Sequence, residues 1–250
     1  MAAVPVQSKL GCHFRCVYCT YRKIEGSSYR LFERESVAEA IRSLSASGVR
    51  NIEFVDNVFN SPYEHALTLC EDLARLRHGA CLYSLELNPL HTDDKLLTLM
   101  ERAGFRGVGI TVESASGAVL ERLRKGYSAE SVYNAATVVK RHKLPCVWIF
   151  MLGGPGETEA TIEETLRFAA KSIRPWDTAF FNMGVRIYPG TELESIARND
   201  GVLNLQGDDM LTAVLYLTSR PRLPILMEEA ARSSASQWRF AAQPSRWRTT

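Results

Sequence analysis

Residues 4–19 read VPVQSKLGCHFRCVYC, a run typical of a β-strand followed at once by a loop with three cysteines. The cysteines are Cys12, Cys16 and Cys19, in the spacing Cys-x3-Cys-x2-Cys. With 6 cysteines in 250 residues, this spacing is expected by chance roughly 0.003 times per chain of this length. Chance is therefore a poor explanation, and the run is the first candidate functional site.

Composition limits the classes of protein to consider. The chain is 46% hydrophobic, which is enough for one substantial core in 250 residues. Lysine plus arginine, 30, nearly balance aspartate plus glutamate, 28, so the charge argues against nucleic acid or an anionic membrane as partner. Residues 1–7 lack a signal-peptide pattern, and no stretch approaches 18 consecutive apolar residues. We therefore expect a soluble cytoplasmic protein with one catalytic domain.

Six β-type runs alternate with helical patterns, which predicts βα units around a parallel sheet. The predicted strands are residues 4–9, 51–55, 81–87, 106–112, 145–151 and 178–187. The predicted fold class is α/β, a partial (β/α)6 TIM-type barrel with a short C-terminal extension. Its functional face lies at the carboxyl ends of the strands, where the cysteine run falls.

The predicted barrel core is residues 1–203, and residues 204–250 are an extension or cap whose basic, aromatic tail is expected to be loosely ordered. Three helix starts carry a hydroxyl followed three residues later by a glutamate, the capping-box pattern. These pairs are Ser36 with Glu39, Ser61 with Glu64, and Thr191 with Glu194. Gly104 is predicted to end another helix in a left-handed turn.

Three thiolates on a 4Fe-4S cube leave one iron without a protein ligand, which is then open to a substrate or cofactor. A structural zinc site would need four ligands, but His13 directly follows Cys12 and no second Cys-x2-Cys pair occurs downstream. Cys16 and Cys19 alone would also fit a thioredoxin-type pair. The third cysteine favours the cluster, with zinc left as the alternative.

With Tyr18 before the last cysteine, the run resembles the signature of the radical S-adenosylmethionine (radical SAM) enzymes. The resemblance implies a 4Fe-4S cluster on Cys12, Cys16 and Cys19, with the amino and carboxylate groups of S-adenosylmethionine on the open iron. One electron would then cleave the sulfonium to methionine and a 5′-deoxyadenosyl radical. A flavodoxin- or ferredoxin-type electron donor is implied as a partner.

The resemblance also assigns residues that follow the second and fourth strands. Asp56 and Asn57 stand where family members hold the methionyl amino group, although the usual Gly-Gly-Glu is absent. Glu113, with Ser114 beside it, would bind the ribose hydroxyls. Arg124 would neutralise the methionyl carboxylate, although a cation at a helix C-terminus is also an ordinary dipole partner.

Two later segments resemble the parts of the family that hold the adenosyl group. Gly153 and Gly154 open a turn that fits neither a P-loop nor a dinucleotide fingerprint, and we interpret it as backbone that approaches the cofactor closely. Arg186, Ile187 and Tyr188 resemble the segment that holds adenine, and Arg186 could instead contact a carboxylate.

Glu86 and Asn88 are two residues apart on the third strand, so both could face the barrel interior as substrate contacts. The remaining cysteines, Cys70, Cys81 and Cys146, lie in apolar surroundings, where a free cysteine behaves as a small hydrophobe. No spacing among these three supports a second cluster.

Residues 21–25, 54–60, 85–89 and 186–191 resemble the branch of the family that usually carries a cobalamin-binding domain before the barrel. The first strand begins within a few residues of Met1, so we expect no such domain in front. Cobalamin would then come from a missing part of a longer protein or from a partner, or would not be used.

We therefore expect a radical SAM enzyme that removes hydrogen from a small organic substrate, in natural-product or cofactor biosynthesis, leading to methylation, rearrangement or ring formation. A cobalamin-dependent radical SAM methyltransferase is one alternative. A non-catalytic, cluster-bearing protein similar to a haem chaperone is another, because fold does not imply function.

Overall fold

The computed structural model describes residues 3–203, 213–218, 237–241 and 247–249. Its main sheet consists of β1 (Val4–Val6), β4 (Asn51–Phe54), β5 (Cys81–Leu87), β6 (Phe105–Glu113), β7 (Cys146–Leu152), β8 (Thr178–Met183) and β11 (Gln237–Ala241). The strands lie in this order, and every neighbouring pair is parallel. The first six overlap the six predicted strands, so the prediction of an α/β partial TIM-type barrel is confirmed. The seventh, β11, was not predicted.

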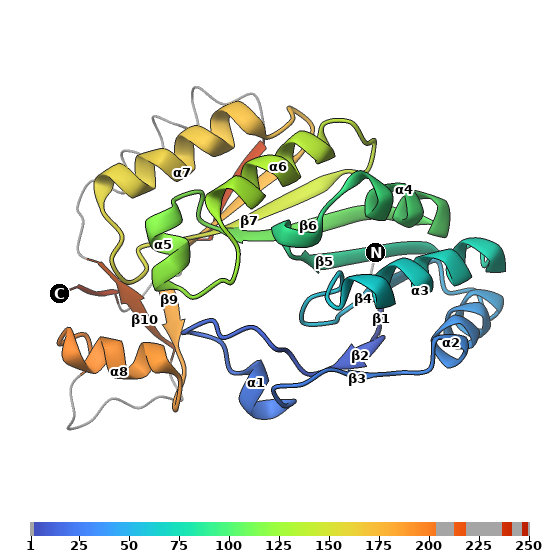
Figure 1. Cartoon of the computed structure of the whole chain (residues 1–250), viewed down its shortest axis with the longest axis horizontal. Helices are drawn as coiled ribbons and strands as arrows, with labels where there is room; N and C mark the ends of the chain where they lie inside the picture. The colour runs from blue at the N-terminus through green and yellow to red at the C-terminus, as the bar shows by residue number, and fades with distance from the viewer. Residues whose placement is uncertain (1–2, 204–212, 219–236, 242–246, 250) are drawn as a thin grey trace.

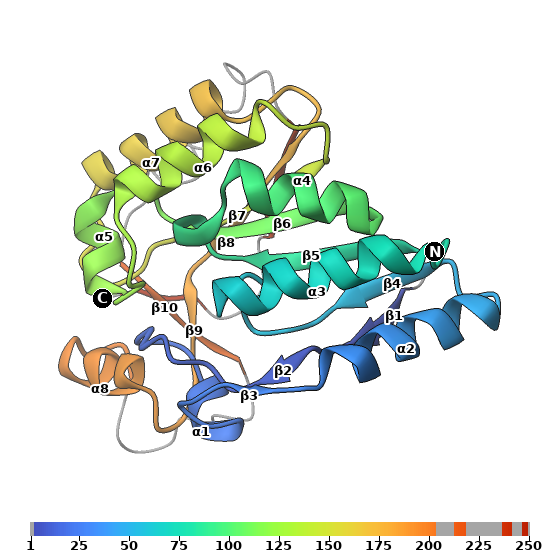
Figure 2. The ribbon, with the colours of Figure 1, turned by 45° about the vertical axis from the view of Figure 1, so that its right-hand side comes forward.

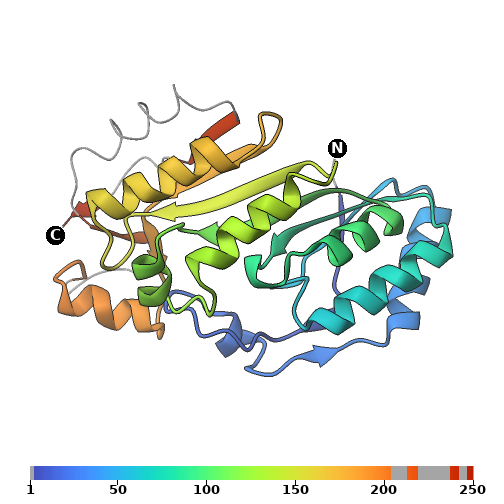
Figure 3. The same cartoon turned by 45° about the horizontal axis from the view of Figure 1, so that its top comes forward.

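Helices connect these strands and cover one face of the sheet. The longer ones are α2 (Arg34–Ala46), α3 (Tyr63–Leu76), α4 (Asp94–Ala103), α6 (Ala129–Val139) and α7 (Glu159–Ser172). Figure 1 and Figure 3 show them side by side along the sheet. The shorter elements are α1 (Tyr21–Ile24), η1 (Pro89–His91), α5 (Gly117–Arg122) and α8 (Glu192–Asn199). Among the described residues, no helix has the length and apolar character needed to cross a membrane.

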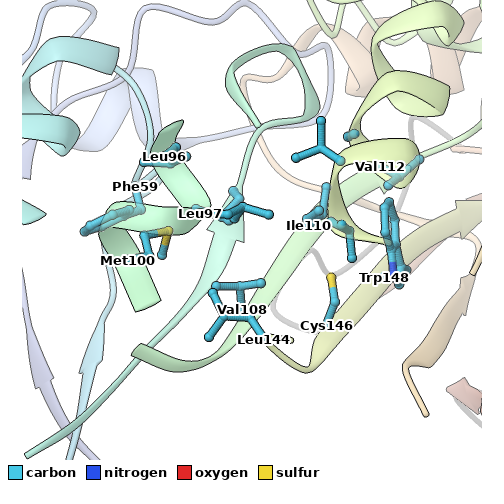
Figure 4. Close-up of a cluster of buried hydrophobic side chains, with 14 of the residues drawn as sticks. Phe59, Leu96, Leu97, Met100, Val108, Ile110, Val112, Leu144, Cys146 and Trp148 are labelled. Atoms are coloured by element: carbon cyan, nitrogen blue, oxygen red, sulfur yellow. The ribbon is translucent and has the colours of Figure 1, made fainter. Parts of the chain in front are cut away.

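The core lies between the sheet and its helices, and β7 shows how the sequence builds it. Cys146, Trp148 and Phe150 are buried, whereas Ile149 and Met151, which alternate with them, are half-buried. The labelled core side chains in Figure 4 come mainly from α4, β6 and β7. Because successive side chains of a strand point to opposite faces, one face of the sheet supplies the core and the other is free to line a cavity.

Two predicted strands are shorter in the structure because the chain leaves the main sheet. The sixth breaks at Gly184, with φ +80°, and β9 (Val185–Ile187) then pairs antiparallel with β10 (Val214–Leu217). A third strand, β12 (Trp247–Thr249), completes this small sheet. The first predicted strand ends at Val6, and β2 (Lys9–Leu10) pairs instead with β3 (Arg30–Leu31). Other residues of the predicted extension, 204–212, 219–236, 242–246 and 250, lie outside the described residues, and the domain boundary at 203 stays a prediction.

Of the three predicted capping boxes, one forms a helix cap. Thr191 accepts a hydrogen bond from the Glu194 backbone N–H at 3.3 Å. Ser36 lies inside α2, which begins after Glu33, and Ser61 receives a hydrogen bond from Tyr29 instead. A hydroxyl three residues before a glutamate does not fix which residue first adopts helical angles. Gly104 ends α4 with φ +97°, as predicted.

Candidate functional site

The cysteine loop, residues 11–20, begins beside a buried ion pair. Asp56 Oδ1 accepts hydrogen bonds from the backbone N–H groups of Ser8, at 2.9 Å, and Lys9, at 3.1 Å. The Lys9 ammonium lies 3.4 Å from Asp56 Oδ2 and donates to the Phe59 carbonyl at 3.0 Å. Burial lowers the pKa of Lys9, and the charge of Asp56 opposes this shift. Asp56 was predicted to lie near the methionyl amino group. In the structure it instead fixes the backbone just before the cysteine loop through these hydrogen bonds.

Two further contacts fix the start of the cysteine loop. Gly11 has φ +89°, and a Cβ there would lie 2.2 Å from the Ser28 carbonyl oxygen, so no other residue fits without displacing the loop. The Gly11 N–H donates to Glu25 Oε2 at 3.0 Å, and the same oxygen accepts from Asn57 Nδ2 at 2.5 Å. Asn57 thus ties the end of β4 to the loop.

The middle of the cysteine loop is held between two helices. The Val17 N–H donates to the Leu123 carbonyl, after α5, at 3.2 Å. The Val17 carbonyl accepts from the Leu193 N–H, in α8, at 2.9 Å. In Figure 2 this part of the chain runs between β2 and α1, close to α8. These backbone contacts fix the cysteine loop across the carboxyl ends of the strands.

A cavity of about 260 Å³ lies between the cysteine loop and those strand ends. Cys12, Cys16 and Cys19 line it. The other predicted site residues that line it are Tyr18, Asn57, Glu86, Asn88 and Glu113. Eight predicted site residues from four segments of the chain therefore line one cavity in the structure. We call it the catalytic cavity below.

The thiols themselves are partly shielded from solvent. The pKa of the Cys12 thiol is raised to about 11, mainly by burial. The charges of Cys16 and Cys19 act in the same direction, whereas a hydrogen bond with the Phe14 backbone lowers the pKa. In the part of the chain that the structure describes, no three histidine, cysteine or carboxylate side chains are grouped to hold a single metal ion. A cube makes a different demand, because each thiolate binds a different iron and the sulfurs stand further apart than around zinc.

An irregularity in β5 turns Glu86 toward the catalytic cavity. The pairing of β5 with β6 shifts between Ser84 and Leu87, and such bulges re-aim side chains. Gly109 on β6 makes room, because a Cβ there would lie 2.6 Å from the Leu85 carbonyl oxygen. Burial, and then the charge of Glu113, raises the pKa of Glu86 to about 7. The result is a carboxyl group that can be neutral or charged near neutral pH.

A second irregularity, in β6, places Glu113. The register with β7 shifts between Thr111 and Glu113, and Glu113 has φ +60°. Glu113 Oε1 accepts from the Tyr18 hydroxyl at 2.7 Å and from Lys125 Nζ at 2.9 Å. Glu113 Oε2 is buried and has no hydrogen-bond partner among the described residues. Since buried polar atoms are nearly always paired, a ligand hydroxyl such as that of a ribose fits this position.

Lys125 is a site residue that was not predicted, because the basic run at residues 122–125 does not show which cation points inward and Arg124 was the predicted one. Lys125 is buried and donates to Tyr18 as well as to Glu113. Burial acts to lower its pKa, but the charge of Glu113 raises it well above the ordinary value. Arg124 has φ +52° and forms an exposed ion pair with Glu192 at 2.7 Å. Because the backbone turns in the left-handed conformation at Arg124, Lys125 points into the catalytic cavity and Arg124 points to solvent.

The remaining predicted residues do not line the catalytic cavity. The Ser114 hydroxyl pairs with Thr165 at 2.9 Å beneath the sheet. The backbone N–H groups of Gly153 and Gly154 donate to the Glu157 carboxylate. Arg186 is exposed over the ring of Tyr188, 4.7 Å from its centroid, and Ile187 is packed in a separate apolar cluster. Met151, just before the glycine turn, does line the cavity.

The fold and the cysteine-lined cavity define an enzyme of the α/β partial-barrel class. Residues 7–169 match the sequence profile of the Radical SAM superfamily, and the chain belongs to this superfamily. The resemblance predicted from the cysteine loop is therefore confirmed, as is the prediction of an enzyme.

Individual relatives are similar over the same region. An uncharacterized methyltransferase of Pyrococcus horikoshii is 29% identical over 200 residues, which is 79% of this chain and 42% of the relative. The tryptophan 2-C-methyltransferase of Streptomyces laurentii is 25% identical over 81% of this chain and 36% of its own length. This chain thus spans less than half the length of these curated relatives.

Solved structures show the same fold. The radical S-adenosylmethionine methyltransferase TsrM of Kitasatospora setae, with cobalamin and a 4Fe-4S cluster bound, has a TM-score of 0.73 and 22% identity. The likeness covers 92% of this chain and 47% of that one. At this identity it supports the fold, including the strands that surround the catalytic cavity.

Proposed function

We propose that this chain is the catalytic core of a radical SAM enzyme acting on a small organic substrate. Cys12, Cys16 and Cys19 would hold a 4Fe-4S cluster, and the catalytic cavity would hold S-adenosylmethionine. The observation that carries the proposal is that Glu113 Oε2, buried in the same cavity as the three loop cysteines, has no hydrogen-bond partner in the part of the chain that the structure describes. Membership of the superfamily supports both cofactors. When bound and reduced, the cluster supplies the electron that cleaves S-adenosylmethionine to methionine and a 5′-deoxyadenosyl radical.

The residues around Glu113 prepare the cavity for the ribose. Lys125 Nζ lies 2.9 Å from Glu113 Oε1, and the Tyr18 hydroxyl donates to the same oxygen and fixes its orientation. Oε2 then accepts a hydrogen bond from a ribose hydroxyl. Lys125 also brings the nearest buried positive charge to the cavity, and we assign to it the role that the sequence analysis gave to Arg124: neutralising the methionyl carboxylate.

Other predicted cofactor contacts take supporting roles in this proposal. Asn57 fixes the loop through Glu25, and Asp56 supports its start. Ser114 orders the turn after Glu113 by accepting from the Ser116 N–H at 3.0 Å. Adenine would extend toward a rim formed by the turn at Gly153 and Gly154 and by the segment from Arg186 to Tyr188. Met151, which lines the cavity, is two residues before this turn.

Glu86 and Asn88 would contact the substrate. Both line the catalytic cavity, where Asn182 adds a third polar side chain. Asn88 is held in place by Asn60, which donates to its carbonyl at 2.9 Å and accepts from its N–H at 2.8 Å. These groups suit a small substrate with hydrogen-bond donors. Glu86 in its charged form would also favour a substrate amine.

A second candidate function is cobalamin-dependent methyl transfer. It is favoured by the two relatives named as methyltransferases and by the fold likeness to a structure with cobalamin bound. Here cobalamin would be bound by a partner or by a further part of the protein, and the catalytic cavity would bind the methyl acceptor beside S-adenosylmethionine.

The test is product analysis with anaerobically reconstituted protein, dithionite and S-adenosylmethionine. We expect 5′-deoxyadenosine and methionine in equal amounts, and neither from Cys16→Ala. Cluster-loaded protein that binds S-adenosylmethionine but releases no 5′-deoxyadenosine contradicts the first function. S-adenosylhomocysteine that forms only when cobalamin and tryptophan are added would establish the second, with tryptophan used as the probe because one relative is named for it.

A further inference from the structure

A second hollow lies on the other side of the cysteine loop. Its volume is about 360 Å³, and Cys16 and Cys19 line it as well as the catalytic cavity. Cys12 lines only the catalytic cavity. The two hollows therefore meet at the same two thiols, so a cluster held there would be reached from one side by S-adenosylmethionine and from the other side by a molecule in solution.

The second hollow is strongly positive. Its charged lining residues are Arg15, Arg22, Lys23, Arg124 and Glu192, and we call it the basic hollow. Glu192 is paired with Arg124, and the Lys23 ammonium contacts the Gly190 carbonyl. Arg15 and Arg22 have no ion-pair partner among the described residues. The whole chain has a formal net charge of only +2, whereas four cationic side chains line this one hollow. Positive charge is therefore concentrated around the two thiols.

We propose that the basic hollow is the docking site of the electron donor, and that the donor is an acidic flavodoxin. This inference rests on the proposed function, because cleavage of S-adenosylmethionine consumes one electron that must come from outside the chain. The anionic flavin hydroquinone gives up one electron and becomes the neutral semiquinone. That electron reduces the cluster and leaves it in the cleavage of the carbon-sulfur bond, so electrons and atoms balance.

Charge and shape both support this partner. An acidic protein is steered toward a positive surface, which raises the rate of encounter and fixes its orientation. A concave surface suits a flavin ring edge, which projects from its protein, better than a ferredoxin cluster, which is enclosed by its own cysteine ligands. Docking here would also leave the catalytic cavity free for substrate throughout the electron transfer.

An RNA is the other class of partner that a basic surface suggests. Its target base would have to enter the catalytic cavity, where the reacting carbon of the cofactor would lie. The free cations Arg15 and Arg22 lie instead around the basic hollow, on the far side of the thiols. The arrangement therefore favours an electron carrier over a nucleic-acid substrate at this surface.

The experiment uses the full chain, reconstituted with its cluster. The test variant combines Arg15→Glu with Arg22→Glu. The control combines Arg50→Glu with Arg106→Glu, two exposed arginines just before β4 and near the start of β6, at the opposite ends of the strands. Both variants change the charge by the same amount. The measurements are the Kd for flavodoxin, the rate of cluster reduction by flavodoxin hydroquinone, and the release of 5′-deoxyadenosine with dithionite.

We expect the test variant to raise the Kd and slow the reduction by about tenfold at low salt, with the difference lost near ~0.5 M salt. The control should behave as wild type, and dithionite should drive both variants equally. Unchanged flavodoxin binding and reduction in the test variant would overturn the inference, as would a loss of RNA binding without a loss of flavodoxin binding. Failure of dithionite to drive cleavage in wild type would instead overturn the proposed function, and the Kd would still decide the docking site.

Discussion

Five of the six cysteines of this chain lie in two regions that differ in what surrounds the thiols. Cys12, Cys16 and Cys19 lie on a loop between two hollows, whereas Cys70 and Cys146 are 0% and 2% exposed between the sheet and its helices. Burial raises the pKa of the two core thiols well above the ordinary range. The same side chain is therefore a candidate ligand where the backbone holds it at a cavity wall and a packing group where apolar neighbours enclose it.

Among substitutions that compare the two regions, Cys16→Ala should have the largest effect, on cluster content and on activity. We expect loss of the cluster absorbance near 400 nm and a fall in 5′-deoxyadenosine formation of about 10³-fold or more, because a thiolate ligand is removed. The midpoint of urea unfolding of the cluster-free protein should change little, since Cys16 is only half-buried. A variant that keeps its cluster and its activity would remove Cys16 from the ligand set.

The next largest effect should come from the buried ion pair between Asp56 and Lys9, which lies beside the start of the cysteine loop. Asp56→Asn leaves the buried Lys9 charge without its partner, so the free energy of unfolding should fall by about 3–5 kcal/mol, and cluster content should fall with it. Asp94→Asn is the matched control, because its pair with Arg141 is exposed, and it should lower the free energy of unfolding far less. Equal effects of the two changes in urea unfolding would refute the role of Asp56 as the support of the loop.

On the cavity side, Glu113→Gln tests the binding of the cofactor. The variant weakens the acceptor for the ribose and should raise the Kd for S-adenosylmethionine by about tenfold to a hundredfold, while the cluster content stays the same. Glu53→Gln is the control, a half-buried carboxylate that does not line the catalytic cavity. Equilibrium binding of labelled S-adenosylmethionine gives both values. A Kd that is the same in Glu113→Gln and wild type would mean that Oε2 is not a cofactor contact.

In the core, Cys146→Ser should have the reverse effect of the loop substitutions. It buries a hydroxyl in the apolar cluster of Figure 4 and should lower the free energy of unfolding by about 1–3 kcal/mol, with cluster content unchanged. Cys81→Ser, at a half-buried position, should cost less. Loss of the cluster in a stable, folded Cys146→Ser protein would break the division between the two regions.

The smallest effect is a pH dependence that arises from Glu86. Its pKa is about 7 in the folded protein against 4.5 for an ordinary glutamate, so between these values the folded state binds more protons than the unfolded state. This contribution to stability is therefore fully present below pH 4.5 and is lost as the pH rises to about 7. Glu86→Gln should remove the loss, and urea unfolding at pH 5 and pH 8 should then differ by about 1–3 kcal/mol less than in wild type. An identical pH dependence in both proteins would contradict the raised pKa.

Much of this arrangement could be predicted from the sequence because it depends on local patterns. The spacing of the cysteines and the continuous apolar run of β7 are local features. The run forms a strand as predicted, and the three loop thiols line one cavity. The inward position of Lys125 and the exposure of Arg124 depend on one left-handed residue at the end of α5, which no pattern of residue types indicates. The burial of Asp56 under the loop depends on a contact with Ser8, 48 residues away in the chain.

The central claim is that S-adenosylmethionine binds in the catalytic cavity at a cluster held by the three loop cysteines. The most direct test is electron paramagnetic resonance of the dithionite-reduced protein with S-adenosylmethionine labelled by ¹⁷O and ¹⁵N on its methionyl group. We predict that the cofactor shifts the cluster signal and that the labels add hyperfine coupling, in wild type and in Cys146→Ser alike. A cluster signal that is the same with and without the cofactor, under conditions where binding is saturated, would contradict the account.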